Sequence, residues 1–174
     1  MYEIGIMNKG DDMAEIKTEK YKIILSREDH KTLWSSKQFK CKMELKDIFT
    51  DNSILTISMS EQDVMNILDC YAQCTEYNNS YIITPPIRTS FNTIISFEID
   101  LFRINEYDGI VEDLSKRWIK ILEYKEDSSD TYIERADIEF EDEYHLDQLM
   151  NAMYFIFLID IYSIDKLDSG MMPF

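Results

Sequence analysis

Alternating apolar and polar positions indicate β structure in the first third of the chain. In QFKCKMEL (38–45) four apolar residues alternate with polar ones, a period of two that is typical of a half-buried strand. The segments 19–26 and 53–58 are also rich in strand-forming residues. We therefore expect these three segments to be strands of one antiparallel sheet.

Two other segments change to the helical period. Ser60 and Asp63 have the spacing of a capping box, and the stripe of apolar residues that follows continues to Cys74. The segment 143–167 places seven large apolar residues at helical spacing and is apolar nearly all round in its middle. This pattern predicts a buried C-terminal helix.

The middle of the chain is rich in β-branched and aromatic residues. Residues 89–105 predict one long strand, bent near its middle. The segment that begins at Gly109 fits both a helix and a hairpin. We favour a short helix to about Ser115, followed by two strands at 117–125 and 131–140.

These patterns predict an α+β protein with a mostly antiparallel sheet and two or three helices, including the buried C-terminal helix. A chain of 174 residues fits one domain, which we assign to residues 14–168. Residues 1–13 are then a flexible extension and residues 169–174 a short tail. No secretory signal and no apolar stretch of membrane-spanning length is visible, so we expect a cytoplasmic protein.

Charge is distributed unevenly along the chain. The net charge is −16, yet residues 1–50 are almost neutral, whereas the region 123–147 has eleven acids and only two bases, Lys125 and Arg135. Such a field repels nucleic-acid phosphates and anionic membranes and attracts basic protein surfaces. We therefore expect no direct binding to nucleic acid or to a membrane.

The densest part of this region is DIEFEDE (137–143). If 131–140 is a strand, Ile138 and Phe140 enter the core, and the acids recur every ~6.7 Å on the other face. That is about half the charge density of a DNA strand, so imitating a duplex would need acids from neighbouring elements. A calcium loop of the EF-hand type would need a glycine that the run lacks. A solvated edge that resists aggregation is the remaining alternative.

Because crowded like charges destabilise a fold, the unbalanced run favours a partner that neutralises it. The predicted partner-binding residues are Glu123, Glu126, Asp127, Asp130, Glu134, Asp137, Glu139, Glu141, Asp142 and Glu143. Tyr124, Tyr132 and Tyr144 are candidate aromatic anchors between them. We expect that reversing the acids at 137, 139, 141 and 143 to Lys leaves the fold intact and slows association.

In size, acidity and lack of catalytic motifs, the chain is similar to two groups of inhibitors. One group is the immunity proteins that neutralise bacterial nuclease toxins, and the other is the phage anti-restriction and anti-CRISPR proteins. No family motif carries this similarity. It implies an inhibitor without metal or cofactor that blocks a basic nuclease or another nucleic-acid-binding enzyme.

An enzyme is the main alternative. Asp108, Glu123 and Lys125 resemble the Asp…Glu-x-Lys arrangement of restriction-endonuclease-like proteins, in which two carboxylates hold Mg²⁺ and the lysine helps to activate water. The resemblance covers three residues and implies a Mg²⁺-dependent hydrolase. The Pro that usually precedes the Asp is missing, and the surrounding acids would repel a phosphodiester.

The three cysteines leave two readings open. Cys70 and Cys74 are four residues apart and could provide two zinc ligands, with a third from Cys41, His30 or His145. Packing as small apolar residues is the favoured reading. A third functional class is an oligomeric scaffold subunit, with the C-terminal helix in a homodimer interface.

Overall fold

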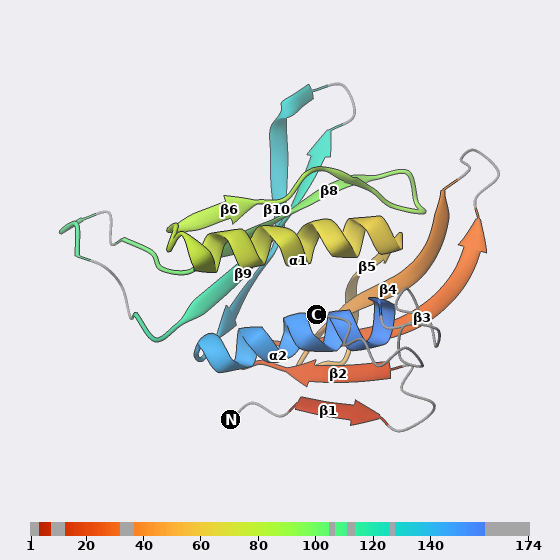
Figure 1. The fold of residues 1–174 in the computed structure, drawn as a ribbon, viewed down its shortest axis with the longest axis horizontal. Coiled ribbons are helices and arrows are strands. Elements are labelled where there is room, and N and C mark those ends of the chain that lie inside the picture. The colour runs from red at the N-terminus through yellow and green to blue at the C-terminus, as the bar shows by residue number, and fades with distance from the viewer. Residues whose placement is uncertain are drawn as a thin grey trace, which may run out of the picture.

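The computed structural model describes residues 4–7, 13–31, 37–104, 107–110, 114–125 and 128–158. Its elements are β1 (Ile4–Met7), β2 (Met13–Lys17), β3 (Tyr21–Lys31), β4 (Gln38–Asp47), β5 (Ser53–Met59), α1 (Glu61–Glu76), β6 (Tyr81–Ile83), β7 (Ile87–Arg88), β8 (Ile94–Asp100), β9 (Arg117–Lys125), β10 (Ser128–Phe140) and α2 (Glu143–Met153). One π-helical turn, Tyr154–Leu158, follows α2. The protein is a mixed α+β structure of antiparallel strands and two helices (Figure 1).

The first sheet has the strand order β1-β2-β3-β4-β5, and each neighbouring pair is antiparallel. The three strands predicted from residues 19–26, 38–45 and 53–58 are confirmed as its neighbours β3, β4 and β5. The alternation in β4 is also confirmed, since its four apolar residues are all buried. Residues 4–7, within the predicted N-terminal extension, pair with β2.

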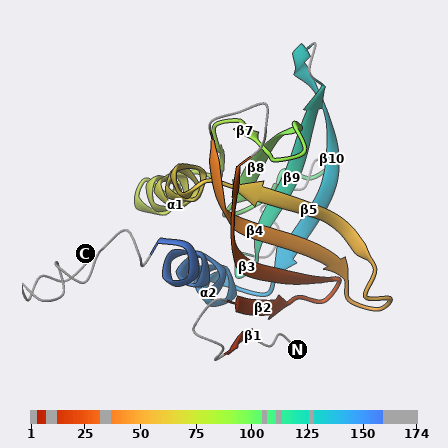
Figure 2. The ribbon, with the colours of Figure 1, turned by 90° about the vertical axis from the view of Figure 1, so that its right-hand side faces the viewer.

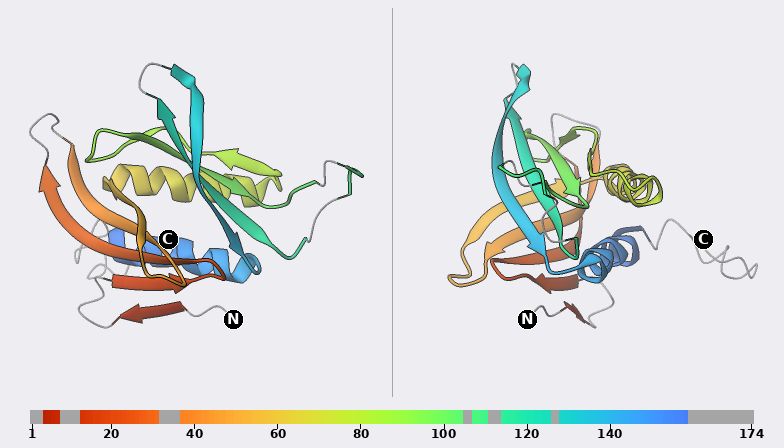
Figure 3. Two further views of the ribbon diagram at one scale, coloured as in Figure 1. Left: turned by 180° about the vertical axis from the view of Figure 1, so that it is seen from behind. Right: turned by 90° about the vertical axis from the view of Figure 1, so that its left-hand side faces the viewer.

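The second sheet has the order β10-β9-β8-β6, and β7 also pairs with β8. The predicted hairpin is confirmed as β9 and β10, with Ile138 opposite Ile119. Ile138 and Phe140 enter the core as expected, at 2% and 0% exposure. The register shifts between Glu134 and Ala136. Such a bulge increases the local twist, and the hairpin projects from the body of the protein (Figures 2 and 3).

The predicted long strand over 89–105 is wrong in its first part. Only Ile94–Asp100 forms strand β8, whereas Thr89 and Thr93 close a tight turn through a backbone hydrogen bond of 2.9 Å. Asn92 within this turn has a φ of 61°, which Asn tolerates better than most residues. Turn chemistry therefore outweighed the β-branched composition, and β7 folds back onto β8.

The helix after Ser60 is confirmed together with its capping box, in which Ser60 and Asp63 bond each other's backbone nitrogen. Helix α2 begins after Asp142 and becomes the π turn at Tyr154. The described residues of the predicted short helix, 109–110 and 114–115, are not helical. The predicted tail 169–174 lies outside the described residues.

One cluster of buried apolar side chains joins both sheets and both helices. A cavity of about 10 Å³ between these elements is no larger than one water molecule needs, so the core is closely packed. Neither of the described helices is long and apolar enough to cross a membrane. The inner face of the second sheet lies on this core, and its outer face points away from the helices (Figure 2).

Candidate functional site

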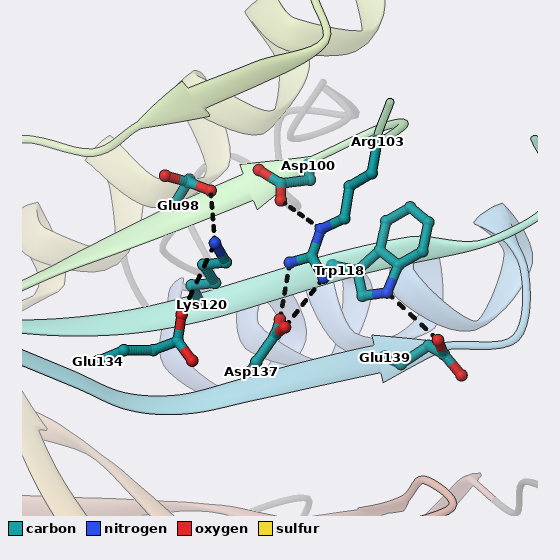
Figure 4. A network of polar contacts seen from close by, with 8 residues as sticks. All are labelled: Glu98, Asp100, Arg103, Trp118, Lys120, Glu134, Asp137 and Glu139. Atoms are coloured by element: carbon teal, nitrogen blue, oxygen red, sulfur yellow. Dashed lines mark hydrogen bonds and ion pairs between the residues drawn. The ribbon is translucent and has the colours of Figure 1, made fainter. Parts of the chain in front are cut away.

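The outer face of the second sheet carries a network of charged side chains (Figure 4). Strand β8 supplies two of its carboxylates because its polar residues alternate with three buried apolar residues that face the core. We call this set the charge network. Its members are Glu98, Asp100, Arg103, Trp118, Lys120, Glu134, Asp137 and Glu139.

Arg103 lies at the centre of the charge network. Its Nε donates to Oδ2 of Asp100 at 2.8 Å, and its terminal nitrogens donate to both carboxylate oxygens of Asp137 at 2.9 and 2.7 Å. The guanidinium also lies 4.6 Å from the ring centroid of Trp118. Partial burial by itself would lower the pKa of Arg103, but the hydrogen bonds to Asp137 and Asp100 raise it above its ordinary value. The planar fork of an arginine suits this bidentate and stacked geometry.

Trp118 connects Arg103 to the next acid of β10. Its indole nitrogen donates to Oε1 of Glu139 at 3.3 Å, which satisfies the polar atom of an otherwise buried aromatic side chain. The other oxygen of Glu139 lies 3.3 Å from Nζ of Lys116. Two acids of the DIEFEDE run, Asp137 and Glu139, are therefore held by side chains of this protein.

Glu98 and Asp100 form a carboxyl pair on β8. Asp100 is 4% exposed, and its Oδ1 has no hydrogen-bond partner among the described residues. Burial, and then the neighbouring carboxylate of Asp100, raise the pKa of Glu98 to about 7. Lys120 compensates only in part, since its Nζ is 3.9 Å from Glu98 and 3.6 Å from Glu134. A proton on Glu98 would supply the donor that Oδ1 of Asp100 lacks.

A polar pocket of about 120 Å³ adjoins the charge network. The turn between β2 and β3 forms one wall, and side chains of the network form the other. Its lining residues are Thr18, Glu19, Lys20, Arg103, Trp118, Asp137 and Glu139. The pocket is large enough for several water molecules, and its charges of both signs select no single class of ligand.

The structure separates the ten predicted partner-binding acids into groups. Glu134, Asp137 and Glu139 belong to the charge network, and Glu123 pairs with Arg135 at 2.5 Å across the hairpin. These partners could not be read from the sequence because they come from segments up to 34 residues away. The excess of acids along the chain is therefore larger than the excess on this face.

The other acids lie near the start of α2. Asp142 is the N-cap, and its carboxylate accepts from the backbone nitrogen of His145 at 2.9 Å. This bond lowers the pKa of Asp142. Glu141 and Glu143 are exposed, with Glu143 3.6 Å from Arg117. Three predicted acids lie outside the described residues, entirely or in their side chains: Glu126, Asp127 and Asp130.

Large apolar side chains collect at the far end of the β9–β10 hairpin. Tyr124 and Tyr132 face each other edge to face, with centroids 5.8 Å apart. Ile133 lines an open groove with Tyr124 and with Phe91 from the turn before β8. We call these four residues the hairpin-end surface. Sequence reasoning identified the two tyrosines as candidate anchors but missed Phe91, since that residue was assigned to a strand.

The residues of the hydrolase alternative are not brought together. Asp108 lies in the loop before β9, where it accepts from the backbone nitrogen of Ile110, whereas Glu123 and Lys125 lie at the other end of that strand. The seven residues from Arg117 to Glu123 span roughly 20 Å of extended chain. The figures agree in placing the loop and the hairpin end far apart (Figures 1 and 3).

The cysteines contribute no metal site among the described residues, where no three of His, Cys, Asp and Glu are arranged to hold an ion. Cys41 and Cys74 are buried, and Cys70 is partly exposed. Burial raises the pKa of Cys41 to about 12, so this thiol is inert at neutral pH. The predicted packing of Cys70 and Cys74 as small apolar residues is confirmed for Cys74, whereas Cys70 is only partly buried.

No family model matches the chain, and no curated protein or solved structure shows significant similarity to it.

Proposed function

We propose that the protein is an acidic inhibitor that binds a basic, nucleic-acid-handling enzyme and blocks its working surface. The observation that carries this proposal is an excess of acids that persists after local pairing. The charge network joins five carboxylates to two cations, Arg103 and Lys120, and Lys116 adds one more at Glu139. Glu141 and Glu143 extend the negative surface toward α2.

The mechanism we propose is electrostatic attraction followed by steric occlusion. A net charge of −16 raises the rate of encounter with a basic surface and lowers it with nucleic acid. The partner would be a cytoplasmic nuclease or defence enzyme of the kind that immunity proteins and phage anti-CRISPR or anti-restriction proteins block. Catalysis, metal and cofactor have no role in this mechanism.

We also infer that the two sheets and two helices act as a single domain with α2 in its interior. The shared core cluster supports this inference, as do five buried residues of α2. A single rigid body is suited to occlusion because little ordering is required when it binds.

Affinity capture at low and high salt tests the proposal, with the protein as bait in lysate of its native host. Basic nucleic-acid-binding enzymes identified by mass spectrometry should be retained at low salt and lost at high salt. They should also be lost by the double variant Glu141→Lys and Glu143→Lys. The matched control is Asp69→Lys and Glu76→Lys, which makes the same charge change at exposed positions of α1. Retention of only neutral or acidic proteins, insensitive to salt, would refute the proposal.

A further inference from the structure

We propose that the hairpin-end surface is the apolar anchor of the partner interface and inserts into the basic enzyme, while the surrounding acids steer the approach. This inference rests on the proposed function and assigns its contact surface. The four residues involved are Phe91, Tyr124, Tyr132 and Ile133.

This end of the hairpin is exposed. Strand β8 begins at Ile94, opposite Tyr124, and Tyr124 lies opposite Tyr132, so these side chains lie where the β8 edge of the sheet ends. Tyr132 and Ile133 are consecutive and point to opposite faces, yet both are 52% exposed. Apolar side chains on both faces of a solvated ribbon are unfavourable for the protein alone, and such patches mark sites of interaction.

The hairpin-end surface includes a groove. Phe91, 69% exposed, stands beside Ile133 and Tyr124 along an open groove of about 680 Å³. Glu123 and Lys125 complete its wall. A groove of this size accepts one or two large side chains of a partner, including the aliphatic stem of an arginine or lysine.

Local contacts hold the elements that border the groove. The tyrosine pair and the Glu123–Arg135 ion pair hold side chains of the hairpin, and the turn closed by Thr89 fixes the backbone that carries Phe91. The two threonine hydroxyls of that turn, on Thr89 and Thr93, lie 2.7 Å apart. Anchors that are held before binding lose little conformational entropy on association, which favours their use as hot spots.

Charge selects a basic partner over a second copy of this chain as the occupant. Two copies would each bring a charge of −16, and like-charge juxtaposition opposes their association. The same net charge attracts a basic surface, and an apolar depression on that surface would receive the anchors.

Site-specific crosslinking tests this assignment. A photoreactive phenylalanine is placed at Phe91 and, as the matched control, at Phe49, which is 83% exposed in the turn between β4 and β5. The basic enzyme captured in the salt experiment should crosslink from position 91 and not from position 49. With that enzyme purified, Phe91→Ala and Ile133→Ser should each weaken the Kd at least tenfold through faster dissociation, whereas Phe49→Ala should change it less than twofold.

The outcomes separate this inference from the proposed function. If the basic enzyme binds and responds to reversal of Glu141 and Glu143 but not to Phe91→Ala, the anchor is elsewhere and the proposed function stands. If no basic enzyme is captured, both fail. A crosslink from position 91 to a second copy of the chain, with a doubled mass in solution, would replace the enzyme by a homodimer. Unchanged melting temperatures of the variants exclude misfolding as the cause.

Discussion

The two halves of the β9–β10 hairpin differ in what their side chains contact. In the half next to α2, Asp137 and Glu139 are fixed by Arg103, Lys116 and Trp118. At the far end, Tyr132 and other apolar side chains are exposed near the Glu123–Arg135 ion pair. The difference shows that membership of an acidic run does not decide whether a side chain stabilises the fold; its contacts do.

Reversing one held and one exposed acid of the DIEFEDE run should give the largest effect. Asp137→Lys places a second cation against Arg103 and leaves Asp100 to balance both, so we expect the free energy of unfolding to fall by about 3 kcal/mol. Glu141→Lys, at an exposed site four residues away, should change it by less than about 0.5 kcal/mol. Urea denaturation at pH 7.5 measures both. Equal effects would mean that Asp137 is as weakly held as a surface acid.

The sequence led us to expect that the acids at 137, 139, 141 and 143 can all be reversed without loss of the fold. The contacts of Asp137 and Glu139 argue against reversal at these two positions, whereas Glu141 and Glu143 remain suitable for testing association.

Removing the two arginines separately should give the next largest difference. Arg103→Met keeps an apolar contact with Trp118 but leaves the buried Asp100 without its cation. We expect the free energy of unfolding to fall by about 2 kcal/mol. Arg135→Met breaks the ion pair with Glu123 at the hairpin end and should cost about 1 kcal/mol or less, because that pair is more accessible to water. Thermal and urea unfolding of the two variants provide the measurement. A larger loss for Arg135→Met would reverse the roles assigned to the two halves.

Much of the fold could be predicted from the sequence, because period and caps are local signals. The alternation of residues 38–45 and the Ser60 cap each specify an element without reference to the rest of the chain. The turn at Thr89 could not be predicted in this way, because threonine and phenylalanine favour strands unless a residue such as Asn92 closes a turn.

The candidate site was less accessible to sequence reasoning. A run of acids shows its charge but not its counterions, and the partners of Asp137 and Glu139 come from a loop and a neighbouring strand. Register accounts for the contact of Glu139, which lies opposite Trp118, whereas Asp137 lies opposite Lys120 but is bound by Arg103. Arg103 was the one available signal in the sequence. It stands between apolar residues, and a charged residue that is buried among such residues is almost always paired.

The carboxyl pair predicts a pH dependence confined to the network half. The pKa of Glu98 is raised to about 7 in the folded protein, so between about pH 4.5 and 7 the folded state binds more protons than the unfolded state. Stability from this group is therefore present at the lower pH and is lost as pH rises to 7. We expect a decrease of about 1–2 kcal/mol over this interval, measured by urea denaturation at several pH values.

Glu98→Gln should remove that decrease, because its amide can donate to Oδ1 of Asp100 at every pH. The variant should be more stable than the wild type at pH 8, and the difference in their free energies of unfolding should be smaller at pH 5. Glu141→Gln is the matched control for loss of one carboxylate at an exposed site. A wild-type curve that rises between pH 5 and 7, or one with the same slope after Glu98→Gln, would show that no proton is shared at this pair.

The smallest effect on the fold is expected at the hairpin end. Phe91→Ala and Tyr132→Ser remove large side chains that are more than half exposed, so each should change the free energy of unfolding by less than about 0.5 kcal/mol. Trp118→Ala, an aromatic residue of the same hairpin that is 4% exposed, should cost about 3 kcal/mol. A substantial loss from Phe91→Ala would mean that this residue supports the turn before β8. Aromatic side chains that contribute so little to folding are free to contribute their apolar surface to binding.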